Sequence, residues 1–277
     1  MKILNKDKTL SFEVFPPKKD DEFESAFSVM DRLGALKPDF ISVTYGAGGS
    51  RSKKTVEITS YIQNTLKIDA IAHMTCVGCK KEQLLEVAGD LKKANVKYVL
   101  ALRGDRPKDM TDEQFASRDF AHASDMMHFL RENTELHFGG ACYPECHPDC
   151  AHMDDDIDFL REKVDAGLDF VTTQMFFDNN IFYRYLAKLR GRGVTVPVIA
   201  GIMPVANGRQ IARICRLSGT YLPSRFKAIV DRFGDRPDAM LDAGVAYATE
   251  QIVDLFANGV NAVHVYTMNR PEAAERI

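Results

Sequence analysis

Short apolar runs alternate with amphipathic segments along the whole chain. Each run ends in small or polar residues, and the segments between the runs carry apolar residues at helical spacing. An uninterrupted apolar run suits a strand that is covered on both faces, as parallel strands are. The predicted strands span residues 11–15, 40–45, 70–76, 98–102, 138–143, 170–176, 198–203 and 262–267.

Helices are predicted between these strands. They lie near residues 23–33, 54–65, 80–94, 121–132 and 155–166, from about 179 to 190 and from about 209, with a longer helical insertion near 224–258 and a short terminal helix. The run Asp178-Asn179-Asn180 can cap the helix that continues to about Arg190. Eight strands that alternate with helices, without a linker, predict one α/β domain over residues 1–277, a (β/α)₈ TIM barrel. A doubly wound open sheet is the alternative, but the run Gly46-Ala-Gly-Gly-Ser50 lacks the G-x-G-x-x-G dinucleotide fingerprint.

Composition narrows the class of protein. The 277 residues are 45% hydrophobic, enough for a large core, and their 36 basic and 39 acidic residues leave a net charge of −3. A well-mixed balance of this kind argues against binding to nucleic acid. No apolar run reaches the roughly 18 residues that a membrane-spanning helix needs, and the first residues lack the pattern of a signal peptide. We therefore expect a cytoplasmic protein with no membrane span and no nucleic-acid partner.

The chain has six cysteines. Five of them form two groups that could carry chemistry, and Cys215 stands alone. Cys76 and Cys79 make a C-x-x-C pair, which is typical of redox sites and of one half of a metal site. Cys142, Cys146 and Cys150 are spaced by four residues and could supply thiolates to zinc. The alternative for both groups is a set of ordinary small residues at strand ends and in a loop. Because a second C-x-x-C is missing, we predict no metal site.

Polar residues collect where the predicted strands end. In barrels of this type the active site lies at the C-terminal ends of the strands. Glu13 alternates with Phe12 and Val14, so it is expected to point into the barrel. Desolvation there favours the protonated carboxyl group, which suits a general acid near neutral pH; a salt bridge at the strand end is the alternative. The other polar residues at these ends are Thr44, His73, Arg103, Asp105, Tyr143, His147, Gln174, Asn269 and Arg270.

Arg103 and Asp105 flank a glycine at the end of the fourth run. The guanidinium group offers a planar fork that suits a phosphate, and Gly104 lets the backbone approach a ligand closely. Two solvated loop charges are the alternative. His73 stands within an apolar run, where both a hydrogen-bonded core histidine and a catalytic base are possible. Lys163, taken alone, is a solvated helix residue.

Longer motifs occur in order along nearly the whole chain. They are Ser11-Phe-Glu-Val-Phe-Pro-Pro-Lys18, Ile41-Ser-Val-Thr-Tyr-Gly-Ala47, His73-Met-Thr-Cys76, Ala101-Leu-Arg-Gly-Asp105, Tyr143-Pro-Glu-Cys-His-Pro148, Lys163-Val-Asp-Ala-Gly167, Thr173-Gln-Met-Phe-Phe-Asp178, Gly201-Ile-Met-Pro-Val205 and Tyr266-Thr-Met-Asn-Arg270. With these motifs the sequence resembles the bacterial type of the methylenetetrahydrofolate reductase family, flavoproteins built on a (β/α)₈ barrel.

The resemblance implies an FAD-dependent oxidoreductase of one-carbon metabolism and methionine biosynthesis. It implies ping-pong hydride transfer from NADH or NADPH through the flavin to 5,10-methylenetetrahydrofolate, which gives 5-methyltetrahydrofolate. Glu13 matches the catalytic acid of the family, and Asp105 matches the aspartate that contacts the pterin and sets the charge near the flavin. The implied substrate contacts are Asp105, Gln174, Gln210 and Arg270. The implied FAD contacts are Thr44, His73, Arg103, Gly104, Asp105, His122, Ala123, Tyr143, His147, Asp156 and Lys163.

One position departs from the family pattern. Relatives that use NADH carry a phenylalanine on the helix after the seventh strand, which stacks against the dinucleotide, whereas Ile214 stands there in this sequence. An aliphatic side chain cannot stack as an aromatic ring does. We therefore expect weak direct oxidation of NADH, with a partner protein as the alternative electron donor.

Two other classes of protein remain as alternatives. The first is a folate-binding flavoprotein subunit that works only inside a larger electron-transfer complex. The second is a barrel lyase or aldolase that uses Lys163 or Glu13 without flavin. The resemblance also leads us to expect a homo-oligomer and a catalytic domain without the C-terminal regulatory module of eukaryotic relatives.

Overall fold

The structure of the chain is a computed structural model that describes residues 4, 7–17, 19, 22–45, 49–106 and 110–277. Two parts of the predicted pattern lie outside the described residues. They are Lys18 of the first motif, and Gly46, Ala47 and Gly48 of the glycine-rich run after the second strand.

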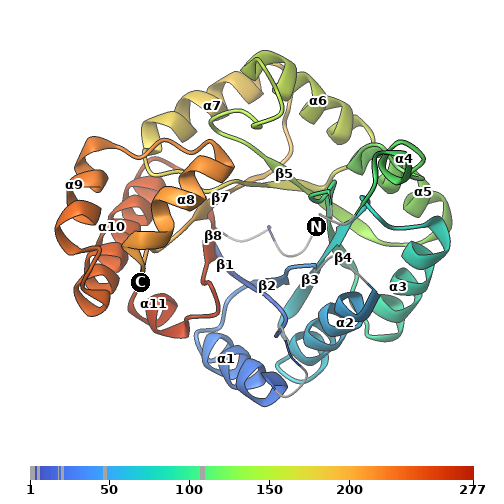
Figure 1. Cartoon of the computed structure of the whole chain (residues 1–277), viewed down its shortest axis with the longest axis horizontal. Coiled ribbons are helices and arrows are strands. Elements are labelled where there is room, and N and C mark those ends of the chain that lie inside the picture. Colours follow the sequence, from blue (N-terminus) through green and yellow to red (C-terminus); the bar gives the residue numbers. More distant parts are fainter. Residues whose placement is uncertain (1–3, 5–6, 18, 20–21, 46–48, 107–109) are drawn as a thin grey trace.

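Eight parallel strands close into a barrel (Figure 1). Each strand pairs with the next in sequence, and β8 pairs with β1, where Ser11 lies beside His264. The strands are β1 (Thr9–Val14), β2 (Phe40–Val43), β3 (Asp69–Thr75), β4 (Tyr98–Leu102), β5 (His137–Cys142), β6 (Phe170–Thr173), β7 (Val198–Ile202) and β8 (Ala262–Tyr266). The predicted (β/α)₈ barrel is confirmed, and the pairing of β8 with β1 excludes the open doubly wound sheet.

Alternation along each strand separates the barrel interior from the layer under the helices. On β1, Phe12 and Val14 pack outward into the large core that the helices cover. A smaller cluster fills the interior; its members are Phe40, Ile71, Leu100, Phe170 and Ile199. These five residues stand in the first half or the middle of their strands, so the C-terminal half of the interior is left to other side chains.

Helices surround the barrel (Figure 1). They are α1 (Phe23–Ala35), α2 (Gly49–Asn64), α3 (Lys81–Lys93), α4 (Asp112–Ala116), α5 (Ala123–Asn133), α6 (Met153–Asp165), α7 (Asn179–Gly191), α8 (Gly208–Ser218), α9 (Ser224–Phe233), α10 (Pro237–Ala257) and α11 (Pro271–Arg276). Within the predicted capping run Asp178-Asn179-Asn180, Asp178 is the residue that caps α7, since its Oδ1 accepts a hydrogen bond from the Asn180 N–H. In the described part of the chain, no helix combines the length and apolar character that crossing a membrane requires.

Two features of the pattern differ from the sequence prediction. The pattern does not predict α4, because five residues are too few to show helical periodicity. The second and sixth strands end earlier than predicted, so Gln174 stands in the loop after β6.

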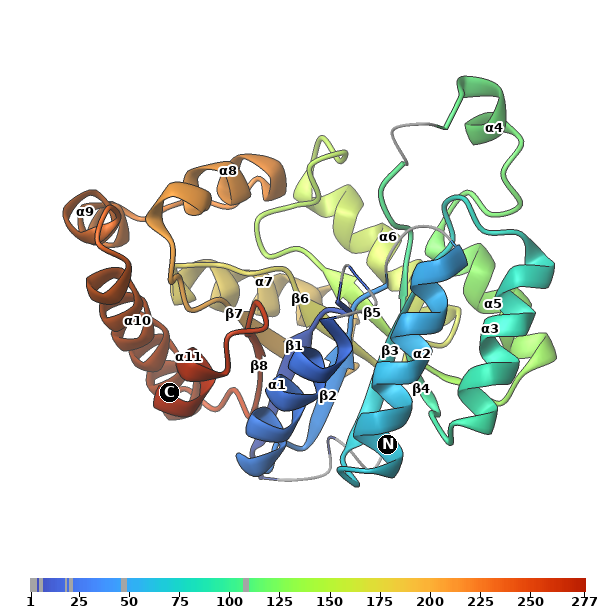
Figure 2. The ribbon, with the colours of Figure 1, turned by 60° about the horizontal axis from the view of Figure 1, so that its bottom comes forward.

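Within 224–258, α10 contacts β7, α7 and α11 and so belongs to the outer layer of the barrel. Figure 2 shows α4 and α8 above the strands instead, at the end of the barrel where the strands finish.

Candidate active site

A carboxyl group from β1 faces into the barrel near the strand ends. Glu13 Oε2 lies 3.5 Å from His73 Nε2 of β3 and 3.9 Å from His264 Nε2 of β8. The Glu13 side chain is 22% exposed, whereas both histidines are buried. The three side chains meet because each stands on an inward position of its strand. Among the residues that the structure describes, the ion-pair neighbours of Glu13 are thus two histidines and not the fixed cation of a strand-end salt bridge.

His264 is held through both ring nitrogens. Its Nδ1 lies 2.7 Å from Ser11 Oγ and its Nε2 lies 3.1 Å from Ser42 Oγ, and the tautomer decides which atom donates in each hydrogen bond. The ring also stacks on Phe40, with centroids 5.6 Å apart. These contacts fix its orientation, so it is suited to position the Glu13 carboxyl group. Sequence reasoning missed His264, and the one available signal was its inward place in the alternation along β8.

His73 carries a buried ring nitrogen without a partner. Its Nε2 makes no hydrogen bond to any described residue, since the 3.5 Å approach to Glu13 lacks hydrogen-bond geometry. Burial lowers the pKa of His73 to about 4, because an imidazolium ion is poorly solvated there, although the Glu13 carboxylate acts in the opposite direction. His73 is therefore neutral at pH 7 and can offer Nε2 to a ligand at the barrel mouth.

The lowered pKa of His73 predicts a pH-dependent stability. In the unfolded chain this imidazole binds a proton below about pH 6.5, whereas in the folded protein it binds one only below about pH 4. The unfolded state therefore binds more protons between these values, and the free energy of unfolding falls as the pH is lowered through this range, by up to about 3 kcal/mol. Urea unfolding of the cofactor-free protein should show a smaller loss for His73→Asn than for the wild type. An equal loss in both proteins would contradict a buried, neutral His73.

The end of β4 carries two charges and a glycine in a left-handed conformation. Arg103 Nη2 lies 2.6 Å from Asp149 Oδ2 of the β5–α6 loop, and this ion pair lowers the pKa of Asp149. Gly104 has φ +79°, and a Cβ atom there would lie 2.8 Å from the Cβ atom of Thr75. Conformation and space thus both exclude a side chain at this position. Because Asp105 is exposed, the turn presents a cation, an open backbone and an anion in three successive residues.

The β5–α6 loop and α6 bring four further predicted residues together. The Tyr143 ring packs edge-on against His147, with centroids 4.5 Å apart, and the His147 N–H donates to Asp156 Oδ2 at 3.2 Å. Burial raises the pKa of Asp156 and lowers that of Lys163, whose Nζ donates to the Ala141 carbonyl at 3.3 Å. Lys163 is therefore a largely enclosed amine and not the solvated residue that its helix position alone suggests.

The remaining predicted cofactor residues stand at the ends of other elements. His122 precedes α5, where its N–H donates to Asp125 Oδ2 at 2.8 Å and its side chain is exposed, and Ala123 is buried at the start of the helix. Thr44 follows β2, and its N–H donates to the Val14 carbonyl at the end of β1. These three predicted residues thus come from separate segments that follow β2 and β4.

These side chains suit a dinucleotide cofactor such as FAD. A pyrophosphate group is bound by cations and by backbone that it can approach closely. Arg103 and Lys163 can supply the cations, and Gly104 leaves the backbone open. His73 adds the clearest sign, because a buried polar atom without a partner is costly unless a ligand satisfies it.

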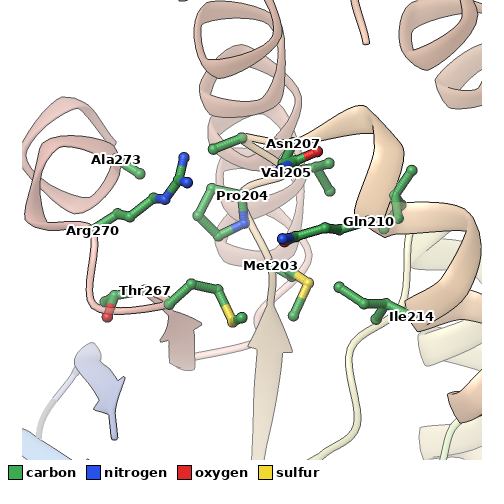
Figure 3. A pocket seen from close by; sticks show the side chains of 12 residues that line it. Met203, Pro204, Val205, Asn207, Gln210, Ile214, Thr267, Arg270 and Ala273 are labelled. Carbon is green, nitrogen blue, oxygen red and sulfur yellow. The ribbon is translucent and has the colours of Figure 1, made fainter. Parts of the chain in front are cut away.

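A pocket beside the end of β7 holds two of the predicted substrate residues (Figure 3). Gln210 of α8 and Arg270, which precedes α11, reach toward Pro204 from opposite sides. Ile214 lines the pocket one helical turn after Gln210, and Met203 adds further apolar surface. A guanidinium group, an amide and apolar walls suit a ligand that has a carboxylate and an aromatic body.

The loops after β5 and β6 are tied to each other and to the segment after α8. The Gln174 N–H donates to the Cys142 carbonyl at 2.7 Å, and the Gln174 Oε1 accepts from the Met175 N–H at 3.0 Å. Glu145 Oε2 accepts from the Tyr221 N–H at 2.7 Å, and burial raises the pKa of Glu145. Sequence reasoning did not single out Glu145, although it stands in a quoted motif. This contact holds the β5–α6 loop next to the segment that follows α8.

The six cysteines are free thiols. Burial raises the pKa of Cys76 to about 11 and that of Cys142 to about 12, and the pKa of Cys146 is raised to about 11 for the same reason. These three thiols are thus protonated at neutral pH, unlike the thiolates that redox chemistry and zinc binding require. Among the residues that the structure describes, no group of three or more His, Cys, Asp or Glu side chains is arranged to hold a metal ion.

Comparison with known protein families shows to which family the chain belongs. The family model for methylenetetrahydrofolate reductase matches residues 1–277 of the chain. The chain belongs to the methylenetetrahydrofolate reductase family. The family expected from the sequence motifs is thereby confirmed.

Known methylenetetrahydrofolate reductases are about one-third identical to this chain. Methylenetetrahydrofolate reductase (NADH) 1 of Arabidopsis thaliana is 33% identical, over 99% of this chain and 50% of that protein. The 5,10-methylenetetrahydrofolate reductase of Escherichia coli is 31% identical, over 97% of this chain and 88% of that protein. The chain therefore spans about half the length of the plant relative and most of the bacterial one.

One solved structure shares the fold at lower identity. It is an uncharacterized protein from Clostridium thermocellum that binds two copies of 5-methyl-5,6,7,8-tetrahydrofolic acid. The two structures superpose with a TM-score of 0.69 at 15% sequence identity, over 99% of this chain and 96% of the other. At such an identity the likeness shows the fold alone.

Proposed function

We propose that this chain catalyses the FAD-dependent reduction of 5,10-methylenetetrahydrofolate to 5-methyltetrahydrofolate. The observation that carries the proposal is the inward carboxyl group of Glu13, held near the barrel mouth beside two buried histidines. The family gives the reaction class, and relatives in plants and bacteria bear the name of this activity. FAD, when bound, would supply hydride transfer in two separate half-reactions.

Glu13 is the proposed acid. Delivery of its proton to the folate helps to open the imidazolidine ring to a reactive iminium. The Glu13 side chain is 22% exposed, so a ligand can reach it, while His264 Nε2 lies 3.9 Å from its Oε2 and is itself held by two serines. Thr267 Oγ1 donates to the Glu13 carbonyl at 2.6 Å and so fixes the backbone. A neutral His73 does not form an ion pair with this carboxyl group.

Four residues are the proposed substrate contacts. Arg270 and Gln210 share one pocket, and the guanidinium fork of Arg270 suits the carboxylate at the glutamyl end of a folate. Asp105 is exposed at the end of β4, where its carboxylate can accept hydrogen bonds from the pterin and set the charge near the cofactor. Gln174, in the loop after β6, is the fourth.

The chain's own groups would hold FAD through charge and close approach. Arg103 and Lys163 would neutralise the pyrophosphate. The pyrophosphate would take the place of Asp149 as the anionic partner of Arg103. Gly104 would let the backbone lie against the cofactor, and His73 would use its unpaired nitrogen. The other proposed contacts are Thr44, Asp105, His122, Ala123, Tyr143, His147 and Asp156.

Ile214 bears on the electron donor. It lines the pocket beside Gln210, and the described residues of that lining are all non-aromatic. A nicotinamide or adenine ring bound there would lack an aromatic partner, which is worth about 0.5–1.5 kcal/mol. We propose that NADH and NADPH reduce the flavin slowly and that a partner protein, in a larger electron-transfer complex, is the main donor.

Flavin bleaching tests the donor proposal. Wild-type protein loaded with FAD is mixed anaerobically with NADH or NADPH, and the visible absorbance of the flavin is followed. Ile214→Phe should tighten NADH binding about two- to tenfold by adding a stacking ring, whereas the control Ile214→Leu should leave it unchanged. Bleaching of the wild type at rates typical of enzymes, roughly 1–1000 per second, would refute a slow direct reaction.

The lyase or aldolase alternative finds little support in the site. A lysine that forms a Schiff base needs its amine free to meet a carbonyl substrate. The Lys163 amine instead donates to the backbone carbonyl of Ala141. A protein that takes up no FAD and stays colourless would nevertheless favour that alternative over a reductase.

A further inference from the structure

The turn after β8 contains two successive residues in the left-handed backbone conformation. Met268 has φ +53° and Asn269 has φ +54°. The Arg270 N–H closes the turn, since it donates to the Thr267 carbonyl at 2.9 Å. Glycine adopts this conformation most easily, and asparagine is among the few other residues that tolerate it. Asn269 therefore suits the turn, but the backbone alone does not explain why an asparagine stands there.

The Asn269 side chain binds the main chain at the end of β1 through both of its polar atoms. Its Oδ1 accepts from the Phe15 N–H at 2.9 Å, and its Nδ2 donates to the Phe15 carbonyl at 2.8 Å. The pairing of β1 with β8 runs as far as Glu13 and Tyr266, so Phe15 lies beyond it. A carboxamide carries the same donor and acceptor as a peptide group. The side chain thus continues the strand pairing after the main chain of β8 has turned away.

The same turn holds the main chain of the proposed acid. Thr267 Oγ1 donates to the Glu13 carbonyl at 2.6 Å and accepts from the Asn269 N–H at 3.2 Å. From the side of β2, the Thr44 N–H donates to the Val14 carbonyl at 2.9 Å. The strand end that carries the Glu13 carboxyl group is therefore fixed by both of its neighbours in the barrel.

We propose that Asn269 is a positioning residue that sets where the Glu13 carboxyl group stands relative to the bound folate. The proposal rests on the proton delivery proposed above for Glu13. Arg270 is the next residue, and its side chain reaches toward Pro204 in the proposed folate pocket (Figure 3). One turn thus ties the group that would hold the folate carboxylate to the strand that carries the acid. A misplacement of about 1 Å can cost about 100-fold in rate, so this tie affects proton delivery.

Reoxidation of chemically reduced flavin by 5,10-methylenetetrahydrofolate tests the proposal in the FAD-loaded protein. Asn269→Gly keeps the left-handed turn, and with it the place of Arg270, but removes both hydrogen bonds to Phe15. The rate at saturating folate should fall about tenfold, while the folate concentration that gives half of this rate should change less than about twofold. Asn95→Gly is the matched control, because Asn95 is also left-handed, with φ +57°, and precedes β4 at the opposite end of the barrel. It should react as the wild type does.

Two further variants separate positioning of the acid from a general structural role. Asn269→Asp has nearly the same shape and can still accept from the Phe15 N–H, but it places an oxygen without a proton against the Phe15 carbonyl. Its rate should therefore fall at least as far as that of N269G. Combined with Glu13→Gln, N269G should cost less than about twofold, because the acid that Asn269 positions is then absent.

Wild-type rates in N269G and N269D would overturn the positioning role. An equal loss from N269G with and without Glu13→Gln would also overturn it, since Asn269 would then not act through Glu13. A weaker affinity for the folate with an unchanged rate at saturation would show that Asn269 acts through Arg270 instead, and would contradict the proposal. If the wild type itself fails to reoxidise its flavin with the folate, the proposed function is wrong and the positioning role falls with it.

Discussion

The substitution Glu13→Gln is expected to slow the reduction of 5,10-methylenetetrahydrofolate strongly while FAD stays bound. Glutamine keeps the size of the side chain but cannot deliver a proton, and a positioned general acid typically contributes about 10²–10⁴-fold to a rate. The rate at which the folate reoxidises chemically reduced flavin should fall by a factor in this range. Flavin absorbance after rapid anaerobic mixing measures this half-reaction without a nicotinamide donor.

His264→Gln is the paired variant for this experiment. His264 is buried and held by Ser11 and Ser42, and its Nε2 lies 3.9 Å from Glu13 Oε2, so it acts through Glu13. We expect a smaller loss of rate than for E13Q and a shifted pH profile of the folate half-reaction, which a merely structural role would not produce. Wild-type reoxidation by E13Q would rule out Glu13 as the acid.

Gly139→Ala is expected to lower the free energy of unfolding by about 1–3 kcal/mol, the usual cost of overpacking a core. A Cβ atom at position 139 would overlap the ring of Phe170, which is fully buried in the interior cluster. The ring has little room to move, because Phe40 and Ile199 pack in the same cluster. Urea unfolding of the cofactor-free protein measures the change.

Two variants control for the added methyl group. Gly89 lies within α3, and nothing stands within 4 Å of an added Cβ atom there. Gly89→Ala should therefore raise stability by about 0.5–1 kcal/mol, since alanine favours a helix over glycine. Gly139→Ala combined with Phe170→Leu should recover part of the loss, because the two sites are in contact and couple. Wild-type stability of G139A alone would contradict the packing of the barrel interior.

The barrel could be predicted because its strands are buried on both faces and therefore appear as apolar runs. The same period of two places Glu13 opposite Phe12 and Val14, so its inward direction also follows from local sequence. The identity of its neighbours in the barrel does not follow from local sequence. His264 reaches Ser11 only through the pairing of β8 with β1, a contact between residues 253 positions apart. No local pattern distinguishes a histidine in such a strand from an ordinary core residue.

The residues proposed to hold FAD show the same limit of prediction from local sequence. Lys163 stands on a helix that is mostly polar, and its burial depends on how α6 lies against β5. Arg103 is recognisable as a strand-end cation, but its partner Asp149 is 46 residues away on a different loop. The pocket beside Arg270 joins residues that follow β7 to residues that follow β8, and no sequence motif encodes this arrangement. Residue types at strand ends could be predicted, whereas pairings between loops could not.

The most direct test of the central claim is reoxidation of reduced flavin by the folate. The FAD-loaded protein is reduced with dithionite without oxygen, the excess is removed, and 5,10-methylenetetrahydrofolate is added while the visible absorbance is followed. We expect the oxidised flavin spectrum to return, with one 5-methyltetrahydrofolate formed per flavin, whichever donor the protein uses. A flavin that stays reduced in the presence of the folate would contradict the proposed reaction.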